Sequence, residues 1–349
     1  MPSTFVKRAL QLAGALVSLQ PAIGFADDMI TNAWSGPEVT PFCLVMYAMQ
    51  DSNMPPGFTA KYKVKLQNTL LTTSMYPVVT ANGDVDIGQC SGTSTVFNAW
   101  DKGAHGLFAF AFGAKAPVFQ MVVAPGINTL ADLKGKRIGI PGIQSAAAEG
   151  LQMILKRGAN LLPQRDYDFL DVGSNSAVTA ALLSKRIDAA GSYPPYSYDM
   201  EKRGFKILAD ESTYVPEYTT GMQIANRAWV QKNHEVFIRL LKAMLETGAW
   251  FKDPANETAV EAWFTQHISA SPLDADTAKR VYDFYIKQNR LALDGSVTES
   301  TVRANLDILK ERGYITDAQI PPLGQVVDFS YLNEARRELG LPPAPEFAK

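Results

Sequence analysis

Residues 131–160, ADLKGKRIGIPGIQSAAAEGLQMILKRGAN, constrain the fold more than any other stretch of the 349-residue chain. Arg137–Ile140 is an apolar-rich run of strand length, and the Pro-Gly pair that follows ends it. We predict a helix over residues 144–157, with Gly158 closing its carboxyl end. The stretch is one strand–loop–helix step of an α/β sheet. The free N–H groups at such a helix start can receive an anion or a polar oxygen, although a plain connection without a ligand fits this stretch equally well.

The first 26 residues have the pattern of a secretory signal peptide. Lys7 and Arg8 precede a run of apolar and small residues over 9–23, and the small residues Gly24 and Ala26 flank Phe25 as in a cleavage site. We expect cleavage after Ala26 and export of the mature chain to the periplasm. Elsewhere the sequence lacks the ~20 consecutive apolar residues that a membrane span needs.

Charge and metal-ligating residue types exclude several functions. The formal net charge is −2 and no basic block occurs, so we do not expect nucleic acid as a partner. The histidines at 105, 234 and 267 are far apart and have no metal-ligand spacing, so we expect neither a metal nor a cofactor. In an exported protein Cys43 and Cys90 could pair, but core positions for both fit the sequence equally well.

Strand and helix signals alternate up to about residue 225, and helices alone follow. Asn-Gly-Asp at 82–84 is a turn signal that leads into the strand GDVDIG, and a similar helix–strand–polar loop step occurs at 185–190. This pattern predicts α/β lobes built on parallel sheets. The predicted strands cover 29–34, 62–66, 85–88, 107–112, 118–123, 137–140, 167–172, 186–190, 205–208 and 219–225.

Small polar loops without any charged residue follow the carboxyl ends of five predicted strands. Ligands of open α/β sheets bind at that edge. The loops supply hydroxyls, amides and backbone N–H groups, while their aromatic residues supply flat surfaces. Helix capping and core packing are the alternative roles for the same residue types. The candidate ligand-binding residues are Trp34, Ser35, Gly36, Gln89, Cys90, Ser91, Gly92, Thr93, Gln144, Ser145, Ala146, Ser174, Asn175, Ser192, Tyr193 and Tyr196.

Signs of catalysis are weak. The sequence contains no Gly-x-Ser-x-Gly elbow, no phosphate-binding Walker loop and no Gly-x-Gly-x-x-Gly motif. Asp84 and Asp86 could form a carboxylate pair, but their position at a turn and strand entry favours a structural role. We therefore predict that the protein is not an enzyme.

Several stretches together resemble a known family. They are the leader, ADLKGKRIGIPG, GDVDIG before a polar loop, the helix-rich C-terminus, and DFSYL at 328–332 before a last helix. Over nearly the whole mature chain, the sequence resembles the nitrate/sulfonate/taurine and thiamine-precursor group of substrate-binding proteins of ABC transporters. The resemblance implies a type II periplasmic binding protein. Such a protein is a monomeric two-lobed receptor that closes on a small molecule and hands it to the membrane permease of an ABC transporter.

On this interpretation residues 27–123 and 222–349 form lobe one with a helical C-terminal extension, and residues 124–221 form lobe two, with a hinge between them. The uncharged loops favour a small organic anion or a neutral heterocycle, held by helix starts and aromatic residues of both lobes without an ion pair. We expect stacking on Trp34 from lobe one and on Tyr193 or Tyr196 from lobe two.

Two alternative functions stay open. One is an enzyme like the pyrimidine-synthesis enzymes that share this fold, whose family carries a Cys-rich iron segment that two isolated cysteines cannot supply. The other is a sensory module that presents its ligand to a membrane kinase. The sequence determines neither the identity of the ligand nor which transporter or sensor is the partner.

Overall fold

The computed structural model describes residues 27–36, 39–54, 58–143, 145–173, 175–269 and 271–347. The predicted signal peptide, residues 1–26, lies outside them, and so do the candidate ligand residues Gln144 and Ser174. Within the described ranges, no helix is long and apolar enough to cross a membrane.

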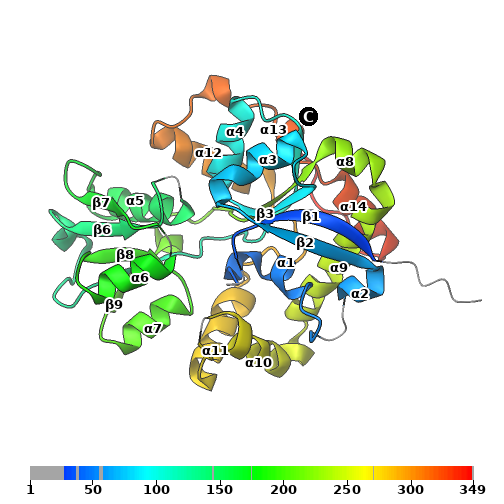
Figure 1. Ribbon diagram of the computed structural model, residues 1–349. Helices are drawn as coiled ribbons and strands as arrows, with labels where there is room; N and C mark the ends of the chain where they lie inside the picture. Colours follow the sequence, from blue (N-terminus) through cyan, green and yellow to red (C-terminus); the bar gives the residue numbers. More distant parts are fainter. Residues whose placement is uncertain are drawn as a thin grey trace, which may run out of the picture.

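Two five-stranded sheets form the centres of two α/β bodies that lie side by side (Figure 1). In the first sheet β1, β2 and β3 are parallel, and β10 is antiparallel to both of its neighbours. Its order is β2-β1-β3-β10-β4, with bounds Val64–Leu70, Asp28–Trp34, Ile87–Ser91, Met222–Asn226 and Leu107–Ala111. The second sheet has the order β7-β6-β8-β5-β9, with bounds Asp168–Asp171, Arg137–Ile140, Ala189–Ser192, Gln120–Val123 and Lys206–Asp210.

Helices cover both sheets, and only helices follow β10 among the described strands and helices. The α-helices are α1 (Leu44–Ala48), α2 (Phe58–Tyr62), α3 (Tyr76–Asn82), α4 (Thr93–Asp101), α5 (Ala146–Ala159), α6 (Asn175–Leu183), α7 (Tyr196–Lys202), α8 (Arg227–Lys232), α9 (His234–Lys252), α10 (Glu257–His267), α11 (Ala275–Tyr282), α12 (Glu299–Glu311), α13 (Leu323–Val326) and α14 (Ser330–Glu338). A π-helical turn, Asp283–Lys287, continues α11. The predicted α/β fold with a helical C-terminal part is therefore confirmed.

Aromatic packing holds the first body together. Phe108 and Phe110 on β4 lie edge-on to Phe237 of α9, with ring centroids 6.1 and 5.1 Å apart. All three side chains are almost fully buried. Asp86 joins β1 to the turn before β3, since it accepts hydrogen bonds of 2.7 Å from the N–H and hydroxyl of Thr31. The predicted structural role of this carboxylate is confirmed.

Two connections join the sheets, one between β4 and β5 and one between β9 and β10. They run side by side, because the N–H of Ala114 donates to Thr220 O at 3.1 Å and the hydroxyl of Thr219 donates to Ala114 O at 2.7 Å. Gly221 follows with φ +74°, and a Cβ there would lie 2.9 Å from Cys43 Sγ. This crossing therefore requires glycine.

The lobe boundaries stay a prediction, but sheet membership favours a shift of the first one. β5 pairs with β8 and β9 and so belongs to the second sheet, whereas the predicted boundary at 123/124 leaves it in lobe one. We propose that the first connection covers residues 112–119 and the second covers 211–221. The predicted second crossing near 220–222 agrees with this division.

The C-terminal helices touch the second body from two directions. Glu311 at the end of α12 pairs with Lys156 and Arg157 of α5, at 3.0 and 2.9 Å. On the other flank, Arg280 of α11 pairs with Glu201 of α7 at 2.7 Å. The C-terminal extension thus bridges both bodies.

Several local predictions were wrong. The strand predicted over 62–66 begins too early and ends too early, because Tyr62 ends α2 and β2 covers Val64–Leu70. Gly158 does not close α5, which continues to Ala159 and ends at Asn160 with φ +53°. Gly158 serves packing instead, since a Cβ there would lie 2.4 Å from Leu130 Cδ1. Residues 89–91 are not a loop, because they form the carboxyl end of β3. The short helices α2 and α7 were not predicted.

Candidate functional site

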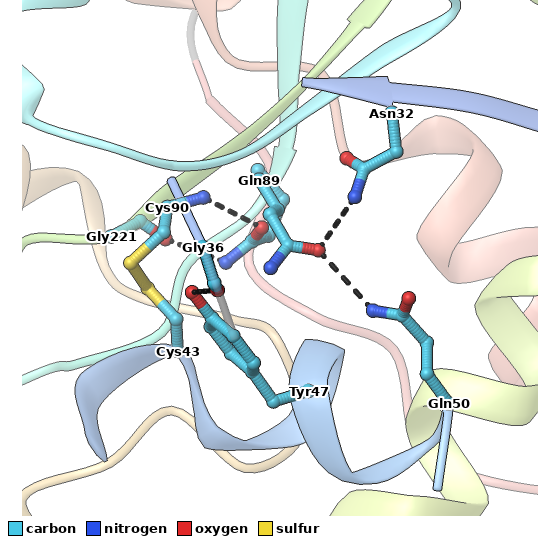
Figure 2. Close-up of a disulfide and its surroundings, with 9 residues drawn as sticks. Asn32, Gly36, Cys43, Tyr47, Gln50, Gln89, Cys90 and Gly221 are labelled. Atoms are coloured by element: carbon cyan, nitrogen blue, oxygen red, sulfur yellow. Dashed lines mark hydrogen bonds between the residues drawn. A yellow bond between two sulfur atoms is a disulfide. The ribbon is translucent and has the colours of Figure 1, made fainter. Parts of the chain in front are cut away.

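A disulfide anchors the carboxyl edge of the first sheet (Figure 2). Cys43, in the helical turn Pro41–Cys43, is bonded to Cys90 in β3, with Cα atoms 5.7 Å apart. The backbone N–H of Cys90 donates to Gln223 Oε1 at 3.0 Å, and Gln223 Nε2 donates to Gly221 O at 2.9 Å. The question that the sequence left open is thus answered: the cysteines pair, and the pair lies beside the second connection.

Four amide side chains form a hydrogen-bonded ring next to the disulfide. Asn32 Nδ2 donates to Asn68 Oδ1 at 2.7 Å and to Gln89 Oε1 at 2.8 Å. Asn68 Nδ2 donates to Gln50 Oε1 at 2.9 Å, and Gln50 Nε2 approaches Gln89 Oε1 at 3.4 Å. Gln89 Oε1 accepts from both Asn32 and Gln50 in Figure 2. The ring engages both ends of the Asn68 and Gln50 amides but only one end of the other two, because Asn32 Oδ1 and Gln89 Nε2 are buried without a hydrogen-bond partner.

Further buried polar atoms at this edge also lack a well-directed hydrogen bond. They are Trp34 Nε1, Tyr76 Oη and Ser91 Oγ. Burial raises the pKa of the Tyr47 phenol, while nearby polar groups of Ser35, Thr40, Gln89 and Trp34 lower it. These groups therefore surround one phenol. Buried polar atoms in folded proteins nearly always have a partner, so a cluster of unpartnered ones indicates a place for a bound molecule or water.

The corresponding edge of the second sheet is built differently, because a buried carboxylate lies at its helix start. Ser145 caps α5: its Oγ accepts from the N–H of Ala148 at 3.2 Å. Glu149, in the first turn of α5, accepts a hydrogen bond from the hydroxyl of Ser94 in α4 and one of 2.8 Å from Tyr218 Oη. A helix start favours a negative charge, and here the chain's own Glu149 supplies it.

Arg312, just beyond α12, balances this carboxylate. Its Nη1 lies 3.2 Å from Glu149 Oε1, and both side chains are at least 97% buried. Arg312 also donates to Gln152 Oε1 at 2.9 Å and to the carbonyl of Ile143 at 3.0 Å. Burial raises the pKa of Glu149, while Arg312, Ser94 and Tyr218 lower it. A charged pair thus lies beside a loop that the sequence showed as uncharged.

The aromatic candidates lie in two separate clusters. Tyr193 is almost fully buried and packs edge-on against Phe42, Phe119 and Tyr196, with ring centroids 5.7, 5.8 and 5.4 Å away. Since Phe42 follows β1 and Tyr193 follows β8, this contact joins the edges of the two sheets. The ring centroid of Trp34 lies 6.5 Å from that of Tyr47, which belongs to the same body. Stacking of a ligand between Trp34 and Tyr193 or Tyr196 stays a prediction.

A cavity of about 430 Å³ opens beside Trp34. Its described lining comes from the β1–β2 segment and α10, with none from the second sheet. The lining residues are Trp34, Val39, Tyr47, Gln50, Asp51, Thr59, Lys65, Leu66, Asn68, Trp263 and His267.

The remaining candidates have mostly backbone or capping roles. Gly36 O accepts from Tyr47 Oη at 3.3 Å, and the hydroxyl of Thr93 donates to Thr219 O at 3.0 Å. Gly92 is the N-cap of α4, and Asn175 is the first residue of α6. Ser35 is exposed, and Ala146 and Ser192 are half-buried.

Sequence reasoning missed many of the polar groups that meet here. The missed residues include Asn32, Tyr47, Gln50, Asn68, Tyr76, Glu149 and Arg312. A signal existed for Asn32, because a buried amide inside an apolar strand is unusual, and for Glu149, an acid in a helix's first turn. Nothing in the sequence indicated that Arg312 reaches α5. Among the described residues, no group of three or more His, Cys, Asp or Glu could hold a metal ion.

Solved structures share this two-sheet architecture. The periplasmic nitrate-binding protein from Synechocystis aligns with a TM-score of 0.68 and 12% identity, over 91% of this chain and 90% of its own. The alkanesulfonate-binding protein from Xanthomonas axonopodis aligns with a TM-score of 0.63 and 15% identity, over 86% of this chain and 98% of its own. The chain has the periplasmic binding protein fold, with its two α/β lobes.

Sequence comparison places the chain in a family. It belongs to the NMT1/THI5-like family, whose model matches residues 71–257. Among curated relatives, the "Putative ABC transporter periplasmic binding protein" of Brachyspira hyodysenteriae is 26% identical over 208 residues, which is 59% of this chain and 58% of the relative. A "Putative binding protein" of Brucella abortus is 28% identical over 162 residues, 46% of this chain and 47% of the relative. The chain thus spans about half of the length of the curated relatives that it matches.

Proposed function

We propose that the protein is an exported solute-binding protein that captures a small organic molecule between its two lobes and delivers it to the membrane permease of an ABC transporter. Membership of the NMT1/THI5-like family and the binding-protein names of the relatives support this function. The nitrate-binding and alkanesulfonate-binding structures support the two-lobed form. The periplasm is the compartment that fits these names, and a disulfide suits it.

The observation that best supports the proposal is that the carboxyl edges of the two sheets are in contact. The start of α4, after β3, touches the start of α5, after β6, through Ser94 and Glu149. Phe42 and Tyr193 touch beside them. Ligands of α/β sheets bind at this edge, and closing one lobe on the other buries whatever lies between them.

We infer that the ligand contacts the first-sheet edge through buried polar atoms that lie beside the Tyr47 phenol and lack a well-directed hydrogen bond. Trp34 Nε1 and Gln89 Nε2 can only donate, so they favour acceptor oxygens or ring nitrogens of the ligand. The buried positive charge of Arg312 is already balanced by Glu149. A neutral heterocycle or a small organic anion held without an ion pair therefore fits best.

Mass spectrometry of small molecules released from the purified mature protein tests this function. We expect one organic compound that rebinds reversibly by isothermal titration calorimetry and is recovered unchanged. A chemical change of that compound during incubation would favour an enzyme. N-terminal sequencing of protein from the periplasm should begin at Asp27, and a start at Met1 would contradict export.

A further inference from the structure

The cavity beside Trp34 is not accounted for by capture between lobes. It lies between α1, α2, α10 and the outer edge of β2, and every described lining residue belongs to the first body. Its volume of about 430 Å³ is within the range of small-molecule sites. A molecule bound there contacts one lobe only, so its binding does not depend on lobe closure.

Flat aromatic groups form much of its wall. Trp263 of α10 stacks on His267 with ring centroids 4.6 Å apart and planes 13° apart, and Trp34 and Tyr47 line the cavity with them. Leu66 and Val39 add apolar surface. Such walls suit the faces of an aromatic or heteroaromatic ring.

The acidic group in the cavity is already engaged by the protein. Asp51 Oδ2 accepts from Trp263 Nε1 at 2.9 Å and lies 3.3 Å from His267 Nε2, and Asp51 Oδ1 accepts from the N–H of Asn53 at 2.9 Å. Gln50 and Asn68 are also engaged, in the amide ring. These groups hold the wall in place and leave little capacity for a ligand cation.

Lys65 is the cationic group that remains. It lies on β2, the edge strand of the first sheet, and no ion pair or hydrogen bond of its ammonium group is formed within the described part of the chain. The cavity therefore offers aromatic walls with one open positive charge at its rim. An anion bound there gains a partner without displacing a carboxylate.

We propose that this cavity is a second binding site, which takes a flat organic anion: an aromatic or heteroaromatic ring bearing a carboxylate or sulfonate. The ring lies between the aromatic walls, and the acid group faces Lys65. This site goes beyond the proposed capture between lobes, because no described residue of the second sheet lines it, although it shares Trp34, Tyr47, Gln50 and Asn68 with the first-sheet edge.

The test uses the full mature protein and naphthalene-2-sulfonate as the probe, with neutral naphthalene-2-sulfonamide as the matched compound. Calorimetry should show that the sulfonate binds more tightly than the sulfonamide. Lys65→Gln removes the charge and keeps a polar side chain; it should weaken sulfonate binding by about fivefold or more and change sulfonamide binding by less than about twofold. Lys102→Gln, at an exposed lysine at the end of α4, is the control and should change neither.

Tyr193→Ala separates this site from the one between the lobes. It should leave sulfonate binding unchanged while weakening binding of the compound that co-purifies with the protein. The second site is contradicted if the sulfonate does not bind, if Lys65→Gln binds it as tightly as the parent does, or if Tyr193→Ala abolishes its binding. In the last case the probe occupies the region between the lobes, and the proposed function stands without the second site.

Discussion

The carboxyl edges of the two sheets lie against each other, yet their buried polar groups differ in how they are hydrogen-bonded. At the first edge, next to a disulfide and a ring of amides, the buried donors Trp34 Nε1 and Gln89 Nε2 lie beside the Tyr47 phenol without a well-directed hydrogen bond. At the second edge, Glu149 occupies the helix start and is paired with Arg312. On the proposed function, the first edge therefore offers polar groups to a ligand, whereas the polar groups of the second edge are paired within the protein.

This difference indicates which edge can still form hydrogen bonds with a ligand. A buried donor without a partner costs free energy that a ligand acceptor recovers. The helix start of α5 has already received its negative charge from within the chain, so it has little left to offer an anion. The predictions below test this contrast, from the largest expected effect to the smallest.

The largest effect concerns Glu211, a second buried acid beside α5. Burial raises its pKa to about 8 from 4.5. Between these two pKa values the folded state holds a proton that the unfolded chain releases. The contribution of Glu211 to the free energy of unfolding is therefore fully present below pH 4.5 and is lost as the pH rises toward 8. The shift corresponds to about 5 kcal/mol lost by pH 8 and above.

Urea unfolding from pH 5 to 9 measures this loss. Glu211→Gln keeps the shape of the side chain without the charge, so its stability should be nearly flat over this range and exceed the parent's at pH 9. Equal slopes for the variant and the parent would show that another group causes the dependence.

The next effect is that of breaking the buried ion pair. Arg312→Leu leaves Glu149 buried without its cation and should lower the free energy of unfolding by about 3–5 kcal/mol. The double variant with Glu149→Gln should recover much of that loss, because no uncompensated charge remains. Additive losses in denaturant unfolding of the single and double variants would mean that the two side chains act independently.

Reduction of the disulfide tests the first edge. The Cys43–Cys90 bond closes a loop with a sequence separation of 47, so its loss should cost about 2–4 kcal/mol of stability. The Cys43→Ser/Cys90→Ser variant should also bind the co-purified ligand more weakly, because β3 and the turn before α1 are no longer joined. Calorimetry below the melting temperature of the variant checks this. Unchanged affinity would mean that the disulfide serves stability only.

The smallest effect is at Ser145. Since its hydroxyl caps α5, Ser145→Ala should cost about 1 kcal/mol of stability. A thermal melt without ligand measures it. Thr93→Ala offers a comparison on the first body, where the lost hydroxyl leaves Thr219 O without that 3.0 Å hydrogen bond. A negligible change in melting temperature for Ser145→Ala would show that its hydroxyl does not stabilise α5.

Local signals predicted the fold well. Strand β6 was predicted with its observed bounds, Arg137–Ile140, because an apolar run between turn residues is a local signal. The prediction that Gly158 closes α5 was wrong because glycine has two roles, closing helices and allowing close packing. Only the fold decides which role applies. The small, polar residues at the carboxyl end of β3 predict a loop, yet a buried strand can carry such residues when neighbouring groups supply hydrogen-bond partners.

The site was predicted only in part, because it depends on contacts between distant segments. Strand ends and their loops are visible in the sequence, and they include Gln89 and Ser145. The ring of amides forms only when β1, β2, β3 and the turn after α1 are assembled. The approach of Arg312 to Glu149 depends on how α12 packs against α5, and a single sequence does not record such pairing.

The affinity of the co-purified ligand for Gln89→Leu, measured beside Ser145→Ala, tests the contrast between the two edges most directly. Calorimetry at a temperature where both variants are folded gives the two dissociation constants. We predict at least about a tenfold weakening for Gln89→Leu, which is about 1.4 kcal/mol, and less than about a twofold change for Ser145→Ala. Unchanged binding by Gln89→Leu together with a loss for Ser145→Ala would place the ligand at the helix start of the second lobe and contradict the account.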